Sequence, residues 1–314
     1  MNLEEVHIPV LLKEVLKYLN LKQGNIIFDG TLGGAGHTVE IIKAIAPTGR
    51  VIGVDLHSQT ISTAATKLEK YSQNVILLND NFANIKEILK KINIESIDGL
   101  LLDLGLSSFM IDKSERGFSY LKDEKLDMRF GNDINLSAFD VVNDYPQEKL
   151  IEIFRKYGEE RWSGPIAKNI VKYRETGDIR STKELVEIIK NSIPLKFKYQ
   201  RKGHPAKRIF QAIRMEVNRE LDNLRKAIDD GFEVLKSGGR MAIISYHSLE
   251  DRMVKSKFLQ YEGKCTCPPD FPVCRCGRNE RARIITKKAI KPDSEEISRN
   301  PRSKSARLRV LEKL

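Results

Sequence analysis

The stretch Ile26-Ile27-Phe28-Asp29-Gly30-Thr31-Leu32-Gly33-Gly34-Ala35-Gly36-His37-Thr38 joins a short apolar run to a helical pattern through a glycine-rich turn. Glycines let such a turn bend sharply and approach a ligand, and the amides at the start of the following helix point toward that ligand. Strand, turn and helix in this order are the building unit of a parallel sheet covered by helices. The stretch therefore predicts an α/β fold with a ligand site at the turn.

The same unit recurs three times after this stretch, with apolar runs at 51–54, 75–78 and 99–102. An acidic residue stands at or just past the end of each of the four runs, namely Asp29, Asp55, Asp80 and Asp103. Ligands of an open α/β sheet bind at the carboxyl ends of its strands. We therefore expect these carboxylates to gather at one ligand-binding edge.

The alternation stops between about Ile111 and Arg214, where the sequence is polar with helical patterns at 146–156, 166–175 and 182–191. A long helix is predicted at about 206–232, then a strand at 241–244, and two last strands at 283–286 and 307–311 complete a seven-stranded, mostly parallel sheet. The expected domains are 1–111 and 215–314 for the sheet, with 112–214 as an inserted helical domain.

The glycine-rich turn favours a nucleoside without a pyrophosphate. A dinucleotide fingerprint requires a further glycine three positions after Gly36, where this chain has Val39. Asp55 lies 19 residues past Gly36 at a strand end, which is the position of a carboxylate that accepts both hydroxyls of a ribose. S-adenosylmethionine fits this pattern better than NAD does, and Asp80 is a weaker candidate for the adenine amino group.

Charge is distributed unevenly over the 314 residues, whose formal net charge is +11. Residues 1–150 carry 16 Lys and Arg against 21 Asp and Glu, whereas residues 151–314 carry 38 against 22. This excess indicates either a polyanionic partner or a solvated face with a basic tail. No apolar run approaches the ~18 residues of a membrane span, and the acidic start lacks the pattern of a secretory signal, so a cytoplasmic protein is expected.

Six motifs together resemble those of the ribosomal RNA small subunit methyltransferase H family. They are residues 29–38, 102–108, 115–119, 126–129, 204–208 and 244–252 (DGTLGGAGHT, LDLGLSS, ERGFS, LDMR, HPAKR and ISYHSLEDR). The resemblance runs from His7 to near Val310. It implies a class I S-adenosylmethionine-dependent methyltransferase fold with an inserted helical substrate-recognition domain. It also implies methylation of N4 of a cytidine in the decoding region of bacterial 16S ribosomal RNA, which we expect within the small ribosomal subunit.

Carried onto this chain, the resemblance predicts cofactor contacts. They are Gly34, Ala35, Gly36, His37, Asp55, Phe82 and Asp103. The chain departs from the family's pattern at Phe109-Met110, where a Pro-Gln pair is usual. A side-chain amide contact is therefore not expected there.

Asp103 and His247 are the predicted catalytic residues. Asp103 would orient the cytosine amine or the cofactor, although its carboxylate alternatively caps the following turn. His247 would line the base pocket with Ser248, beside a Tyr246 that stacks on a flipped base, or it is a hydrogen-bonded structural residue. Ser245, His247 and Asp251 do not indicate a hydrolase, because the chain has no G-x-S-x-G nucleophile elbow.

Basic residues around Pro205 are predicted to contact RNA phosphates. They are Lys202, His204, Lys207, Arg208 and Arg214. Trp162, the only tryptophan, is expected to pack inside the helical domain.

The four cysteines, Cys265, Cys267, Cys274 and Cys276, form two C-x-C pairs in a proline-rich segment. Four thiolates so close together predict a structural zinc site, with free or redox-sensitive thiols as the alternative.

Two other functions fit the same sequence. One is a methyltransferase of this fold that acts on protein or DNA. The other is a ribosome-assembly factor that binds the cofactor without turnover. Loss of Asp103 would abolish methylation by an enzyme and would leave an assembly factor unaffected.

Overall fold

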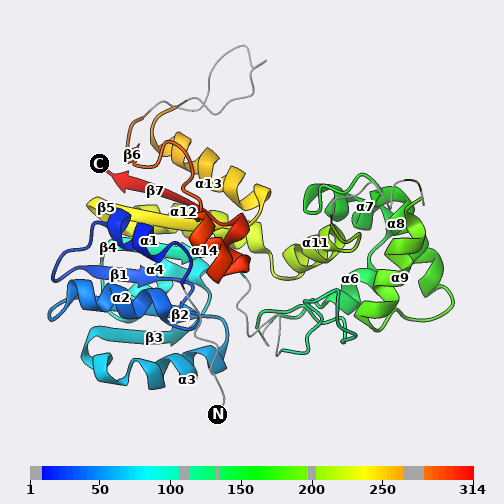
Figure 1. Cartoon of the computed structure of the whole chain (residues 1–314), viewed down its shortest axis with the longest axis horizontal. Helices are drawn as coiled ribbons and strands as arrows, with labels where there is room; N and C mark the ends of the chain where they lie inside the picture. Colours follow the sequence, from blue (N-terminus) through cyan, green and yellow to red (C-terminus); the bar gives the residue numbers. More distant parts are fainter. Residues whose placement is uncertain (1–8, 106–113, 132–133, 195, 197–202, 265–278) are drawn as a thin grey trace. The chain divides into compact units, whose positions relative to one another are not determined.

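The computed structural model describes residues 9–105, 114–131, 134–194, 196, 203–264 and 279–314. The chain forms two compact units, one of residues 1–105 with 221–314 and one of residues 106–220. Figure 1 shows that the first unit contains the sheet and that the second is helical. The helical unit thus begins and ends several residues outside the expected range of 112–214.

The sheet has seven strands in the order β3-β2-β1-β4-β5-β7-β6. The neighbours from β3 to β5 pair in parallel, and β7 is antiparallel to β5 and β6. The strands are β1 (Ile26–Asp29), β2 (Arg50–Asp55), β3 (Val75–Asn79), β4 (Ile97–Asp103), β5 (Leu235–Ser245), β6 (Ala282–Ile284) and β7 (Arg307–Lys313). Every apolar run that the sequence predicts to be a strand lies within or overlaps one of these strands.

Helices cover both faces of the sheet, because successive side chains of a buried strand point to opposite faces. In β4, Leu100 and Leu102 belong to one apolar cluster and Leu101 to the other. The helices of this unit are α1 (Leu12–Leu19), α2 (Gly36–Ile45), α3 (Ser58–Lys67), α4 (Ile85–Lys91), α12 (Glu220–Val234), α13 (Ser248–Tyr261) and α14 (Ser294–Arg299), with short 3-10 helices η1 (Glu69–Asn74), η2 (Phe82–Asn84) and η3 (Pro301–Ser305).

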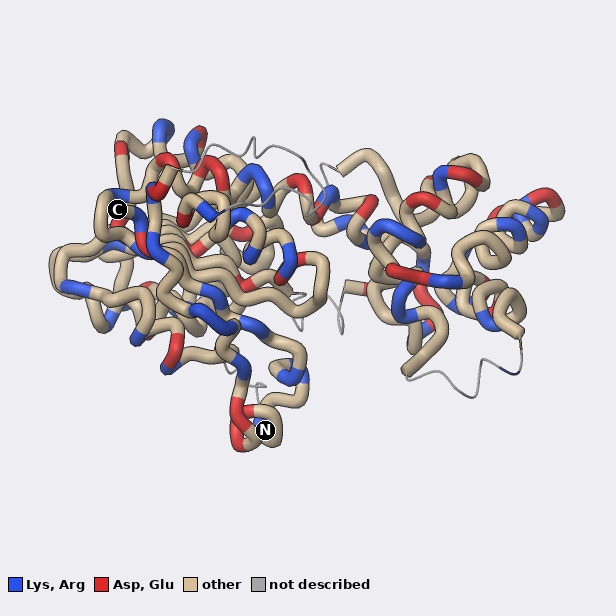
Figure 2. The backbone as a smooth tube through the Cα atoms, turned by 90° about the horizontal axis from the view of Figure 1, so that it is seen from above, with Lys and Arg blue, Asp and Glu red and all other residues tan. Residues whose placement is uncertain are grey.

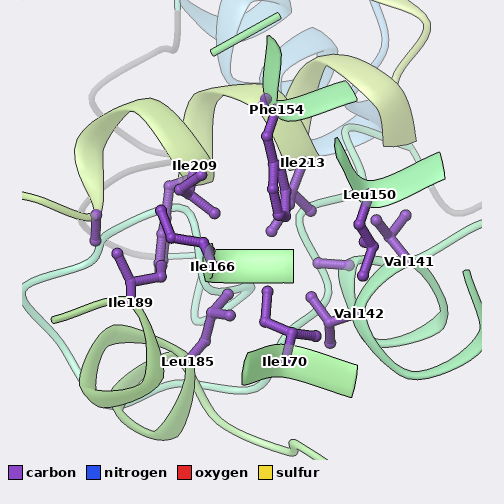
Figure 3. Packing of buried hydrophobic residues seen from close by; sticks show 14 of the residues in the cluster. Val141, Val142, Leu150, Phe154, Ile166, Ile170, Leu185, Ile189, Ile209 and Ile213 are labelled. Carbon is purple, nitrogen blue, oxygen red and sulfur yellow. The ribbon is translucent and has the colours of Figure 1, made fainter. Parts of the chain in front are cut away.

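The helical unit has an apolar core of its own. Its helices are α6 (Ala138–Asp144), α7 (Gln147–Lys156), α8 (Ser163–Arg174), α9 (Thr182–Ser192) and α11 (Lys207–Val217). Figure 3 shows Phe154, Ile166 and Ile213 pointing toward one another in this core, and all three are fully buried. Basic and acidic residues are interspersed along the chain of this unit (Figure 2).

The helix predicted at 206–232 is wrong as a single element, because it is broken into α11 and α12. Arg219 has a φ of +50°, which no α-helix accommodates. The Asn218 amide donates to Met128 O at 2.8 Å and accepts from Phe130 N at 2.7 Å. These contacts with distant backbone hold the chain at the break. None of the described helices is long and apolar enough to cross a membrane.

Candidate cofactor and acceptor site

The glycine-rich turn is fastened at its base by Asp29, the last residue of β1. Asp29 is 1% exposed, and its carboxylate accepts from Thr38 Oγ1 at 2.6 Å and from Thr31 N at 3.2 Å. Burial raises the pKa of Asp29 above its ordinary value, and the Thr38 hydroxyl opposes that rise. Because these contacts come from the turn and from α2, and because Asp29 is fully buried, its carboxylate fixes the turn.

Two glycines of the turn stand where no side chain fits. A Cβ on Gly30 would lie 2.5 Å from Leu102 Cδ2 and 2.8 Å from Phe82 Cβ, and a Cβ on Gly36 would lie 2.4 Å from Pro9 Cγ. Gly36 begins α2, whose N-cap is Ala35 at a φ of +56°. The first amides of α2 therefore open at the sheet edge, as a cofactor site in this turn requires.

Asp55, the last residue of β2, faces the turn from the next strand. Its Oδ2 accepts from Gly33 N at 3.0 Å and its Oδ1 from His57 N at 2.9 Å. Burial raises the pKa of Asp55, and these two amides partly offset the rise. Each carboxylate oxygen accepts two hydrogen bonds, so both oxygens keep capacity for the hydroxyls of a ribose. The donor set fits the predicted nucleoside.

Asp80 and Phe82 follow β3. Asp80 Oδ1 accepts from Asn81 N at 2.7 Å and from Asn84 Nδ2 at 2.8 Å, so this carboxylate holds the start of η2. Phe82 is half-buried against the apolar cluster that contains Leu102. Of the two residues, Phe82 has the surface to contact an adenine.

Asp103, at the end of β4, is held from three sides. Its backbone N donates to Thr31 Oγ1 at 2.6 Å, its Oδ1 accepts from Tyr246 Oη at 2.8 Å, and its Oδ2 lies 3.9 Å from His37 Nδ1. Thr31 and His37 belong to the glycine-rich turn and α2, whereas Tyr246 follows β5. Asp103 therefore links the cofactor side of the edge to the side formed by β4 and β5.

Tyr246 is a positioning residue for Asp103. Its ring lies against Gly105, where a Cβ would come within 3.0 Å of Tyr246 Cε2. Burial, together with the negative charge of Asp103, raises the pKa of Tyr246 well above its ordinary value. The hydroxyl therefore stays protonated and donates to the carboxylate, which gives it a use other than the predicted stacking on a base.

His247 is the N-cap of α13. Its Nδ1 accepts from Glu250 N at 3.3 Å, and the Glu250 carboxylate accepts from His247 N at 3.2 Å, which together form a capping box. Glu250 Oε1 also lies 3.1 Å from His247 Nε2. The geometry gives His247 a structural use, and its catalytic role stays a prediction.

Asp251 pairs with two arginines at the start of β7. Arg309 Nε donates to Oδ1 at 2.7 Å and Arg307 Nη1 donates to Oδ2 at 2.9 Å. Burial alone would raise the pKa of Asp251, but the bonds from Arg309 and Arg307 outweigh it and the pKa is lowered. The backbone N of Asp251 donates to His247 O at 3.2 Å, a bond of the first turn of α13.

The predicted RNA-contacting residues divide into several groups. Lys207 and Arg208 are exposed at the start of α11, where Arg208 donates to Glu159 O at 2.9 Å. Arg214 forms a two-point ion pair with Glu220, at 2.7 and 2.9 Å. His204 stacks on Tyr120 with ring centroids 4.6 Å apart. Lys202 lies outside the described residues.

Two other predictions concern Trp162 and the cysteines. Trp162 packs against the core of the helical unit, as predicted. Cys265, Cys267, Cys274 and Cys276 lie outside the described residues, so the zinc site stays a prediction.

Some residues that build the site were missed at the sequence level. Thr31 and Thr38 connect Asp29, the turn and Asp103, and Arg307 and Arg309 neutralise Asp251. Their partner Asp29 was expected at this edge, because it stands at a strand end like Asp55. The hydroxyl of Tyr246 had none, because its partner lies 143 residues away.

The sheet order, its antiparallel seventh strand and a glycine-rich turn faced by a strand-end carboxylate define the class I S-adenosylmethionine-dependent methyltransferase fold. The sequence model of the MraW methylase family matches residues 4–314. The chain belongs to the MraW methylase family.

Two curated relatives from Clostridium botulinum, strains Loch Maree and Kyoto, are each 50% identical over 312 residues, which cover 99% of this chain and 100% of theirs. Both are named Ribosomal RNA small subunit methyltransferase H. A putative rRNA methylase from Clostridium thermocellum has a TM-score of 0.46 at 12% identity, with 98% of this chain and 100% of that chain covered. A putative methyltransferase from Streptococcus mutans in complex with SAH has a TM-score of 0.45 at 14% identity, with 98% and 99% covered.

Proposed function

We propose that this protein transfers the methyl group of S-adenosylmethionine to N4 of a cytidine in the decoding region of 16S ribosomal RNA. Membership of the MraW methylase family supports methyl transfer, and the name of the 50%-identical relatives supports a small-subunit ribosomal RNA substrate. The single observation that carries the mechanism is the position of Asp103, whose backbone N donates to Thr31 of the turn and whose carboxylate accepts from Tyr246. Such an enzyme acts in the cytoplasm, where ribosomal subunits assemble.

The acceptor amine determines what the site must supply. The lone pair of a cytosine amine is delocalised into the ring, so the amine attacks only when it is held in line with the methyl group. Asp103 is suited to accept one N–H of the amine and to stabilise the positive charge that develops on nitrogen. The hydroxyl of Tyr246 and the backbone bond to Thr31 fix the carboxylate in place beforehand. The methylated amine then loses its proton readily, so no strong base is needed.

The cofactor would lie over β1 and β2. Asp55 would accept the ribose hydroxyls, the turn from Gly34 to His37 would contact the remainder of the nucleoside, and Phe82 would cover the adenine. S-adenosylmethionine supplies an electrophilic methyl group on a sulfonium. The exposed Lys207 and Arg208 of the helical unit would bind RNA phosphates, together with His204, which stacks on Tyr120. Arg214 is held by its ion pair with Glu220, and its contact with RNA stays a prediction.

The test is methyl transfer from labelled S-adenosylmethionine to small ribosomal subunits that lack the modification, with naked 16S RNA, DNA and bulk ribosomal protein as parallel substrates. Nucleoside mass spectrometry identifies the product. N4-methylcytidine, or its further methylated form, from subunits would support the proposal. Label in protein or DNA would identify a different methyltransferase, and RNA binding without any label would identify an assembly factor.

A further inference from the structure

A hollow of about 160 Å³ lies at the sheet edge beyond Asp103. Three segments line it, Tyr246–Ser248 after β5, Lys291 after β6, and Lys304–Arg307 at the start of β7. Ser245 pairs with Arg307 in the antiparallel register of β5 and β7, so the start of β7 shares an edge with the carboxyl end of β5. The hollow is far larger than one water molecule needs. The end of β5 beside it pairs in parallel with the end of β4, where Asp103 lies.

Three basic side chains line this hollow, those of Lys291, Lys304 and Arg307. The lining residues include no Asp or Glu. Lys291 and Lys304 are exposed, and their side chains form no ion pair within the part of the chain that the structure describes. Arg307 shares the single charge of Asp251 with Arg309. Lys291 and Lys304, which no described carboxylate neutralises, therefore favour an anionic ligand.

Two hydroxyl groups add donors to the lining. Ser248 and Ser305 line the hollow together with the lysines. Lysine ammonium groups and serine hydroxyls match the oxygens of a phosphate group, which accept from several directions.

We infer that this hollow binds a backbone phosphate of the RNA strand next to the nucleotide that is methylated. The inference rests on the proposed function and adds a substrate subsite to it. Tyr246 lines the hollow while its hydroxyl bonds Asp103, so a phosphate held there is adjacent to the acceptor position. Asp55 lies three strands away from β5, which is roughly 14 Å at the usual strand spacing. The hollow is therefore separate from the ribose-binding carboxylate.

The experiment uses the double variant Lys291→Gln/Lys304→Gln and a matched control, Lys22→Gln/Lys90→Gln. The control removes the same charge from exposed lysines next to the amino ends of β1 and β4. A fluorescent RNA of the 16S decoding region is titrated with each full-length protein, and anisotropy is recorded at salt concentrations from about 50 to 200 mM. Affinity for S-adenosylmethionine is measured in parallel by calorimetry.

We expect the Lys291/Lys304 variant to bind this RNA about tenfold more weakly than the control does. We also expect its salt dependence to be reduced by about one unit of slope, while its affinity for S-adenosylmethionine equals that of the control. RNA affinity and salt slope equal to those of the control would overturn the inference. Because binding is read without turnover, a wild type that binds this RNA but does not methylate small ribosomal subunits would count against the proposed function alone.

Discussion

Replacing Tyr246 by phenylalanine isolates the contribution of one hydrogen bond to methyl transfer. The change removes the hydroxyl that donates to Asp103 Oδ1 at 2.8 Å and keeps the ring that packs against Gly105. The backbone of Asp103 stays fixed by Thr31. The variant therefore keeps its fold, and only the orientation of the carboxylate is lost.

The expected loss of rate follows from the negative charge of the Asp103 carboxylate, which accepts the hydrogen bond. A hydrogen bond to an ionised group contributes about 1.5–3 kcal/mol, and each 1.36 kcal/mol changes a rate tenfold. If Asp103 acts in the transition state, the Tyr246→Phe variant transfers methyl groups roughly 10- to 150-fold more slowly. The raised pKa of Tyr246 keeps its hydroxyl neutral through the assay range, so the wild-type advantage persists up to at least about pH 9.

The assay is single-turnover methyl transfer to small ribosomal subunits at saturating S-adenosylmethionine. Tyr261→Phe is the matched control, because Tyr261 also donates to a carboxylate, that of Asp229 at 2.6 Å, from the last residue of α13. We expect the control to retain the wild-type rate. Equal rates for the Tyr246 and Tyr261 variants would refute the assignment of Tyr246 as a positioning residue.

Three further predictions concern the cofactor, the turn and the pH dependence of stability. Asp55→Asn should weaken S-adenosylmethionine binding roughly 10- to 150-fold in calorimetry. The control Asp98→Asn, at the amino end of β4 where Asp98 accepts from Ile26 N, should leave this affinity unchanged. Equal affinities in the two variants would exclude Asp55 from the cofactor site. Gly30→Ala should lower the free energy of unfolding by about 1–3 kcal/mol, since its Cβ meets Leu102 and Phe82. The control Gly164→Ala, in α8 with nothing within 4 Å of its Cβ, should raise the free energy of unfolding by up to about 1 kcal/mol. Urea denaturation in which the Gly30 variant is the more stable of the two would contradict the packing of the turn. Asp251→Asn should lower the free energy of unfolding at neutral pH. Because the pKa of Asp251 is lowered in the folded state, the stability difference between wild type and variant should shrink as pH falls below about 4. A difference that grows in acid would show that the pairs with Arg307 and Arg309 do not stabilise the fold.

The sheet and its ligand edge could be predicted because parallel strands are buried on both faces and read as continuous apolar runs. Each run identified from the sequence is a strand, and the carboxyl ends of neighbouring parallel strands must meet at one edge. Asp55 and Asp103 could therefore be placed at that edge without coordinates. The contacts of Asp55 with Gly33 and His57 then follow locally from the turn.

The break between α11 and α12 could not be predicted, because Asn218 and Arg219 fit a helical pattern. The break depends on bonds from Asn218 to the backbone of Met128 and Phe130, which lie 90 and 88 residues away. The bond between Tyr246 and Asp103 is equally remote in sequence. Local patterns carry no information on such pairings.

The sequence around His247 contains the pattern of a helix N-cap, although histidine is better known as a catalytic residue. A residue with a side-chain acceptor followed three positions later by glutamate is the pattern of a capping box, and Glu250 occupies that position. Histidine is an uncommon N-cap, so its chemistry suggested catalysis first. The capping contacts favour the structural alternative that the sequence left open.

The measurement that tests the central claim most directly is single-turnover methyl transfer by an Asp103→Ala variant at saturating S-adenosylmethionine and saturating small subunits. The dissociation constant for S-adenosylmethionine is determined separately, so that cofactor binding and transfer are distinguished. The account predicts that the wild type forms N4-methylcytidine. The variant, with cofactor bound, should form it at least 100-fold more slowly, which corresponds to a loss of about 2.7 kcal/mol of transition-state stabilisation. A variant that forms N4-methylcytidine at the wild-type rate would contradict the assignment of Asp103 as the residue that holds the acceptor amine.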